Sequence, residues 1–209
     1  MMTFGEVGGR IRNSAGFLSL ESTLIGDEKN MATLGLLEDF KVLYLREIAT
    51  LERELDLYSN EASVWTELPG LPNPAGNLFL HLAGSLQHFF GATLGNTGYQ
   101  RNREAEFSKR NVSRSDLKQE LSKARQGVIA AFENLTEDSL TQVFPVQFAD
   151  AAFSTRLTLL QFLSHLAYHL GQIDYHRRVV TGNNASANAI AASDLLNHVE
   201  QKRETNEYS

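Results

Sequence analysis

Helical periodicity is the feature of this sequence that most limits its fold. From Met31 onward, apolar residues recur at intervals of three, four and seven: Leu34, Leu37, Tyr44, Ile48, Leu51, Leu55 and Tyr58. This spacing places them on one face of an α-helix, and such a face is buried against other elements. The pattern predicts a helical domain that begins near Met31.

Three more amphipathic helices are predicted further along the chain. Asn73-Pro74 can open the second, which should run to about Gly95, because Asn caps free amides and Pro is tolerated at the first helical position. Ser115-Asp116 can cap the third. The fourth is expected over residues 155–181 and should end at Gly182.

Four long amphipathic segments without strand-like alternation predict an all-α fold, a four-helix bundle with long connecting loops. At least one connection is expected to cross over the bundle, because two of the loops are longer than tight hairpins need. We expect a flexible N-terminal extension over residues 1–30, the bundle over 31–182, and a loosely structured tail over 183–209. The native start can be Met1 or Met31.

Composition excludes several classes of function. The formal charge is -6 and no dense basic run occurs, so nucleic acid is not expected as a partner. The absence of cysteine excludes disulfides, thiolate metal sites and a cysteine nucleophile, and fits a cytoplasmic location. No segment has the pattern of a signal peptide or the length of a membrane span, so we expect no membrane association.

Histidines gather in the predicted fourth helix, in the segment HLAYHLGQIDYHRR. At about 100° per residue, His165, His169, Gln172 and His176 share one stripe, which borders the apolar face. His165 and His169 are one turn apart, the spacing at which two imidazoles can bind one cation. His176 lies about 10 Å further along the axis, so we expect it at the mouth of a cavity or against another subunit.

A third ligand is expected from the second helix, where spacing alone leaves two candidates. His81 and His88 are seven residues apart and both can face the interior. A lone histidine on an apolar face is more often a hydrogen-bonded core residue than a ligand, and this alternative stays open for both. The segment HLAYH lacks the central Glu of a zinc-peptidase motif, and the sequence places no carboxylate beside the histidines.

The order of these segments resembles the DinB/YfiT-like superfamily of metal-binding four-helix bundles. The similarity rests on Trp65, on LPGLPNPAGNLFLHLAGSL and on SHLAYHLGQIDYHRR, and it spans about residues 31–182. It implies a divalent metal ion bound by His81, His165 and His169, and so favours His81 over His88. Zn or Ni is favoured, while Fe and Mn also suit three imidazoles.

The resemblance implies an enzyme that activates a low-molecular-weight thiol, such as bacillithiol, mycothiol or glutathione, for S-transfer to a small electrophilic substrate. Three neutral imidazoles favour an anionic fourth ligand, which can be a thiolate or a hydroxide. The alternatives are a metal-dependent hydrolase and a non-catalytic, stress-associated metal-binding protein. Gln172 and Asn77 can orient ligands or be ordinary core-edge polar residues.

A homodimer is also expected. Superfamily members often pair, and Phe89 and Phe90 offer more apolar surface than one core face needs. Core packing is the simpler interpretation for one of these two phenylalanines.

Overall fold

The computed structural model describes residues 35–148, 150–189, 191–192 and 195, and in these residues it forms helices and no named strand. The predicted all-α fold is confirmed. The expected extension over residues 1–30 lies outside the described residues, as does most of the expected tail, so the domain boundaries stay predictions. Four main helices are packed together: α2 (Leu36–Leu57), α4 (Ala75–Leu86), α6 (Arg114–Asn134) and α7 (Thr155–Thr181).

Four short elements connect or extend these helices. They are α3 (Glu61–Val64), the π-helical turn η2 (Gln87–Ala92), α5 (Arg103–Ser108) and the 3-10 helix η3 (Glu137–Thr141). The π-helical turn continues α4 directly. Of the four, α5 matters most for function, because it packs against α4 beside the predicted histidine site.

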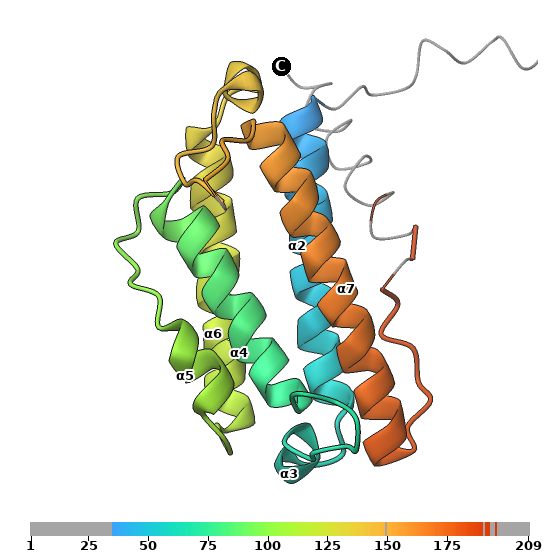
Figure 1. The fold of residues 1–209 in the computed structure, drawn as a ribbon. Helices are drawn as coiled ribbons and strands as arrows, with labels where there is room; N and C mark the ends of the chain where they lie inside the picture. Colours follow the sequence, from blue (N-terminus) through green and yellow to red (C-terminus); the bar gives the residue numbers. More distant parts are fainter. Residues whose placement is uncertain (1–34, 149, 190, 193–194, 196–209) are drawn as a thin grey trace, which may run out of the picture. The chain divides into compact units, whose positions relative to one another are not determined.

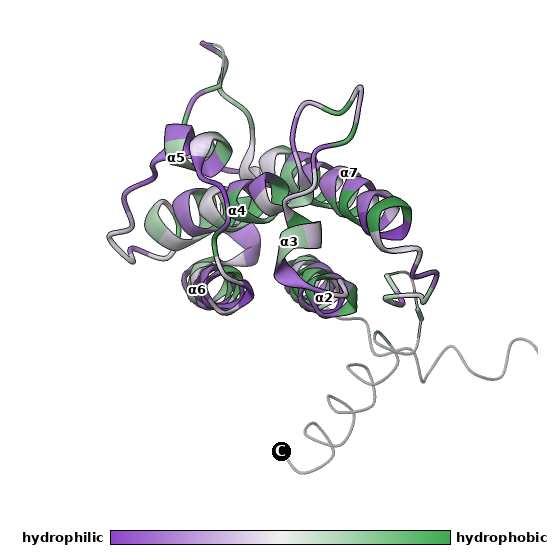
Figure 2. Cartoon of the chain, turned by 90° about the horizontal axis from the view of Figure 1, so that it is seen from below, coloured by the Kyte–Doolittle hydropathy of each residue, from purple (hydrophilic) through white to green (hydrophobic). Residues whose placement is uncertain are grey.

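The main helices are arranged two by two. Helix α2 packs against α6 and α7, and α4 packs against the same two helices (Figures 1 and 2). Helix α4 runs in the same direction as α6, so residues 93–113 return along the bundle and form the expected crossover (Figure 1). The crossover carries α5 and lays it on the outer side of α4.

Hydrogen bonds at both ends of the crossover hold α4 and α6 parallel. Trp65, which precedes α4, donates from Nε1 to the carbonyl of Val112 at 3.1 Å, just before α6. At the other end, Asn134 of α6 donates to the carbonyl of Leu94 at 2.9 Å. Each contact joins the corresponding ends of the two helices.

Helix α4 is the most enclosed element of the fold. All twelve of its residues are buried, because α6 and α7 cover its inner faces and α5 covers its outer one. Enclosure on all sides is typical of a helix that is apolar all round. The polar residues in α4, His81 among them, therefore lie inside the protein and need partners.

Helix starts and ends differ from the sequence prediction in two places. Ser113, and not Ser115-Asp116, caps α6 and accepts a hydrogen bond from the amide of Asp116. Asn73 does not cap α4: the N-cap position is occupied by Pro74, which makes no side-chain cap bond. By contrast, α7 has the predicted bounds, and Gly182 ends it in the left-handed conformation at φ 67°.

A buried arginine fixes the chain that follows α7. Arg177 pairs with Glu54 of α2 and donates to the carbonyls of Asn183 and Ala185. The segment before α7 makes two isolated antiparallel bridges: Val143 with Ser154 and Phe148 with Ala151.

Candidate metal centre

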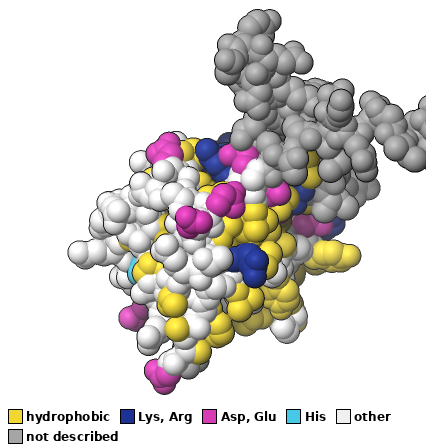
Figure 3. All heavy atoms as spheres, turned by 90° about the horizontal axis from the view of Figure 1, so that it is seen from above, with side chains coloured by type: hydrophobic (Ala, Val, Ile, Leu, Met, Phe, Trp, Pro, Cys, Tyr) yellow, Lys and Arg dark blue, Asp and Glu magenta, His cyan; other side chains and the backbone are white. Residues whose placement is uncertain are grey.

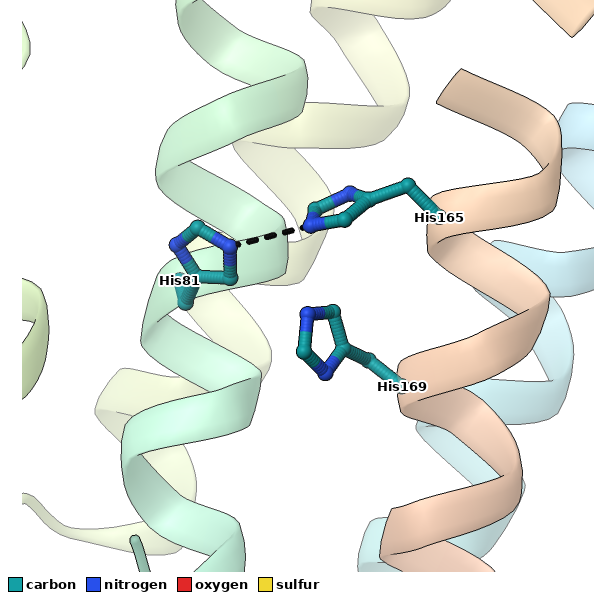
Figure 4. Close-up of side chains that lie close together, drawn as sticks. All are labelled: His81, His165 and His169. Atoms are coloured by element: carbon teal, nitrogen blue, oxygen red, sulfur yellow. Dashed lines mark hydrogen bonds between the residues drawn. The ribbon is translucent and has the colours of Figure 1, made fainter. Parts of the chain in front are cut away.

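Three histidines from two helices meet between α4 and α7. His81 comes from α4, and His165 and His169 come from successive turns of α7 (Figure 4). One ring nitrogen of each lies within 4.8 Å of those of the other two. The rings are nearly perpendicular, with centroid separations of 5.1 Å, 5.3 Å and 4.6 Å. The structure thus brings together the three predicted ligands as a candidate metal site.

The spacing of the nitrogens suits a small divalent cation. Nitrogens bound tetrahedrally to one metal at 2.0–2.1 Å lie about 3.3 Å apart. Nε2 of His81 and Nε2 of His165 are 3.1 Å apart, already close to that separation. Figure 4 shows these two rings pointing at each other and the His169 ring directed toward the same space. Small side-chain rotations would bring all three nitrogens to metal-binding distance.

Hydrogen bonds on the far side of two rings set which nitrogen faces the centre. Nδ1 of His81 lies 2.9 Å from Oε2 of Glu106, and Nδ1 of His169 lies 2.7 Å from Oε1 of Gln172. Both oxygens only accept, so each Nδ1 carries the proton and each Nε2 presents a lone pair to the centre. Partners of this kind on the outer nitrogen are a regular feature of metal-binding histidines.

Glu106 is fully engaged by its neighbours. Arg101 donates from Nε to Oε1 at 2.7 Å and from Nη2 to Oε2 at 2.8 Å, beside the His81 contact. Burial would raise the pKa of Glu106, but the hydrogen bonds from His81 and Arg101 outweigh it and lower the pKa. The carboxylate is therefore ionised at neutral pH, and each of its oxygens accepts at least one hydrogen bond.

Helix α5 holds Glu106 against α4. Asn102 caps this helix by accepting from the amide of Ala105, and Asn77 of α4 donates to the backbone carbonyls of Glu106 and Lys109. Gly84 makes the close approach possible, because a Cβ there would lie 2.3 Å from Oε1 of Glu106. The side chain of Asn77 thus orients the carboxylate-bearing helix, and it forms no hydrogen bond with a ring of the three histidines.

Sequence reasoning missed Glu106 and Arg101, since it found no carboxylate for the site. The residues lie in a polar stretch whose weak apolar pattern predicts no helix. A signal was nevertheless present: Asn102 followed by Glu104 and Glu106 is a capping residue with acidic residues in the first helical turn.

Burial keeps the α7 histidines neutral. It lowers the pKa of His165 to about 4, with smaller contributions from the charges of His169, His81 and Arg101. Burial also lowers the pKa of His169, and the hydrogen bond to Gln172 opposes this only in part. Neutral imidazole is the form that binds a metal, so both residues are in the required protonation state at pH 7.

The other two described histidines lie outside this group. His88 is seven residues from His81, about 10 Å along the helix, and its ring packs on Phe89 with centroids 4.7 Å apart. His176 is only 3% exposed; its Nδ1 meets the hydroxyl of Tyr58 and its Nε2 meets the carbonyl of Thr66, each at 2.8 Å. His176 is therefore a hydrogen-bonded core residue in the wall of the second cavity, and its contact with another subunit stays a prediction.

Two cavities adjoin the histidines from opposite sides. The first, of about 480 Å³, is lined by His81, Ser85, Phe89, Arg101, Arg103, Phe148, Phe153, Leu157, Thr158, Gln161, Phe162 and His165. The second, of about 510 Å³, is lined by Leu68, Leu71, Pro72, Asn73, Leu78, Tyr168, His169, Gln172, Tyr175, His176 and Val179. The cluster therefore forms part of the wall of each cavity.

The two phenylalanines singled out in the sequence have different surroundings. Phe90 is buried in the core against Tyr44, with ring centroids 4.6 Å apart. Phe89 is half-buried, packs against Phe162 at 4.5 Å, and lines the first cavity. Core packing thus accounts for one of them, as predicted.

The fold and site define a helical bundle with a partly buried three-histidine cluster beside two cavities. Within the described part of the chain, no helix is long and apolar enough to cross a bilayer. Residues 36–194 match the model of DUF1572, a family of proteins of unknown function, and the chain belongs to this family. Comparisons with curated proteins and with solved structures give no significant match.

Proposed function

We propose that His81, His165 and His169 bind one divalent metal ion. The observation that carries this proposal is the pair of outer contacts, Glu106 to His81 and Gln172 to His169, which turn two Nε2 lone pairs toward His165. The resemblance to the DinB/YfiT-like superfamily supports the same ligand set. An all-imidazole site favours Zn or Ni over Mg or Ca, which prefer oxygen ligands, and is also compatible with Fe or Mn.

The proposed activity is transfer of a low-molecular-weight thiol to a small electrophile. A bound divalent cation supplies Lewis acidity, which lowers the pKa of a thiol beside it. The thiol loses its proton to solvent, its sulfur forms a bond to the electrophilic carbon, and the leaving group departs with its electron pair. The chain contributes the neutral histidines, the fixed ring orientations and the two cavities, one for each reactant.

The surroundings of Glu106 favour thiol transfer over hydrolysis. A hydrolase needs a group that can take up or deliver a proton, and the only described carboxylate that contacts the triad is Glu106. Both of its oxygens accept hydrogen bonds, and its pKa is lowered. A thiol needs no such group, because at neutral pH it can lose its proton to solvent once its pKa is lowered.

Metal analysis and a thiol-transfer assay test the two parts of the proposal separately. We expect about one metal per chain in wild type and in His88→Ala, and loss of metal in His81→Ala and His169→Ala. A panel of thiols with a generic aryl electrophile should then react faster with wild type than with His169→Ala. Metal without any rate difference would leave a non-catalytic metal-binding protein. No metal after reloading with Zn and Ni would refute the site itself.

The expected homodimer stays a prediction. Tyr168, Tyr175 and Val179 of α7 are 65%, 74% and 65% exposed and give apolar surface that a second copy can cover. Sedimentation equilibrium measures the mass directly, and a monomer at all concentrations would contradict the prediction.

A further inference from the structure

The first cavity carries features of a binding site that the histidine cluster alone does not explain. Its volume of about 480 Å³ falls in the range of small-molecule sites. His81 and His165 form one part of its wall, so a molecule held in it would lie beside the proposed metal centre. The remaining wall divides into an aromatic part and a polar part.

The aromatic part is built from three phenylalanines. Phe89, Phe148 and Phe162 come from α4's extension, the α6–α7 connection and α7, and their ring centroids lie 4.5 Å to 5.9 Å apart. Phe153 and Leu157 extend this wall to the surface, where both side chains are exposed. Figure 3 shows hydrophobic side chains gathered at the end of the molecule that contains this connection. An apolar or aryl group suits this part of the cavity.

The polar part carries positive charge. Arg103 lines the cavity, is exposed, and stacks its guanidinium on Phe107 at 5.2 Å. It forms no ion pair with any residue that the structure describes, so its charge is available to an anion. Arg101 is held in place by Glu106 through Nε and Nη2, which leaves Nη1 to donate elsewhere. Guanidinium groups bind carboxylates through parallel N–H donors.

A buried hydroxyl beside the cavity has no hydrogen-bond partner in the described part of the chain. Thr158 of α7 lines the same cavity and is 3% exposed, yet its Oγ1 has no hydrogen-bond partner among the described residues. Buried polar atoms are nearly always paired, and an unpaired one has a cost that a bound molecule can remove.

We propose that this cavity binds a small carboxylic acid with an aryl or similarly apolar body. The carboxylate lies at Arg103 and Nη1 of Arg101, and the apolar body lies among the three phenylalanines. Rotation of the Thr158 side chain would turn its buried Oγ1 to a polar atom of the ligand. This inference deepens the proposed function and rests on it for the role of the neighbouring centre, since the acid would be the electrophilic substrate. Binding itself requires no metal.

Calorimetric titration of the full-length chain in EDTA tests the cavity alone. The probes are 3-phenylpropionate, its neutral amide and propionate. We expect 3-phenylpropionate to bind with a dissociation constant of about millimolar or tighter, and the amide and propionate at least about 10-fold more weakly. Equal binding of acid and amide, or no binding of the acid, would overturn the proposal.

Variants locate the binding. Arg103→Gln should weaken binding of 3-phenylpropionate about 10-fold, and Thr158→Val about 3-fold or more. Arg110→Gln, which lies just past the C-terminal end of α5 and outside the cavity, should leave binding unchanged. Arg103 is exposed, so its variant should fold, and thermal melts check this. No effect of Arg103→Gln would overturn the assignment. Binding of 3-phenylpropionate by a wild-type protein that shows no thiol transfer would refute the proposed function and leave the cavity assignment intact.

Discussion

Nδ1 of His81 lies 2.9 Å from Oε2 of Glu106, and this contact decides which nitrogen of His81 faces His165. A carboxylate can only accept, so the imidazole proton is held on the outer side and the inner nitrogen keeps its lone pair. Arg101 Nη2 also lies 3.3 Å from Nδ1 of His81, but both are donors and share the carboxylate. The orientation of one candidate ligand thus depends on a residue 25 positions away on a different helix.

Glu106→Gln should weaken metal binding. The amide is nearly the same size, but it has lost the negative charge and can present an NH₂ group to His81, which would allow the other tautomer. We expect the metal affinity to fall about 10- to 100-fold, as is typical when the outer partner of a ligating histidine is lost. Competition titration with a chelating dye measures this. Glu104→Gln, an exposed change on the same helix, should have no effect, and equal losses in both would contradict the assigned role.

Gly84→Ala should reduce metal affinity while leaving the protein folded. The new methyl group would lie 2.3 Å from Oε1 and 2.9 Å from Cδ of Glu106, and this side chain is held by Arg101 and His81 and cannot move freely. We expect reduced metal affinity with a folded, helical protein by circular dichroism.

Gly171→Ala is the matched control for Gly84→Ala. It lies on exposed helix with nothing near its Cβ position, so it should stabilise the fold by about 0.5–1 kcal/mol through helix propensity. Unfolding in urea measures this gain. Full metal affinity in Gly84→Ala would show that metal binding does not depend on the present position of Glu106.

Protonation of His176 should make the fold less stable in mild acid. Burial lowers the pKa of His176, and the Thr66 carbonyl opposes this only in part. The unfolded chain takes up a proton at this residue as the pH falls through about 6.5, while the folded protein does so only at lower pH. Stability is therefore full above about pH 7 and is lost as the pH falls below 6.5, with a slope of at most about 1.4 kcal/mol per pH unit.

The variant His176→Gln isolates this effect. It should lower stability at pH 7.5 by about 1–3 kcal/mol, because two buried hydrogen bonds are disturbed. It should also make the stability profile between pH 7 and pH 5 less steep, although the lowered pKa values of His165 and His169 leave part of the slope. Tyr58→Phe keeps the imidazole and should keep the slope. Urea unfolding in EDTA at several pH values gives the comparison, and parallel profiles for His176→Gln and wild type would refute the assignment.

Arg177→Ala should cost about 3–5 kcal/mol of stability, because it leaves Glu54 buried without its guanidinium partner. The double variant Glu54→Leu with Arg177→Met removes both charges and should be less destabilised than the single one, although the carbonyls of Asn183 and Ala185 still lose their donor. Chemical denaturation of wild type and the two variants measures the free energies of unfolding. A smaller loss of stability in Arg177→Ala than in the double variant would contradict the prediction.

The sequence predicted what depends on local periodicity and helix signals. Residues 155–181 have an apolar face and a terminal Gly182, so α7 was predicted with its observed bounds. The convergence of His165 and His169 followed from their one-turn spacing. The choice of His81 over His88 did not, because both face the interior; it came from the family resemblance, and the structure brings His81 to the cluster.

What the sequence did not reveal depends on tertiary contacts. Helix α5 has six residues, too few to be stable alone, and it exists because Asn77 binds its backbone and Gly84 admits its side chain. Helix α5 is far from α7 in the sequence, so the sequence alone does not show that Glu106 lies near the histidines. The unpaired hydroxyl of Thr158 is equally invisible in a sequence, since it is defined by what surrounds it.

The π-helical turn Gln87–Ala92 has a consequence for how related chains are compared. Such a turn is equivalent to an α-helix with one residue inserted, and here it directs Phe90 into the core and Phe89 to the cavity. Deleting one residue would restore a regular helix and rotate all that follows by about 100°. An alignment of family members can show a gap of one residue at this turn. Such a gap means that a different aromatic ring lines the cavity, even where the flanking residues are identical.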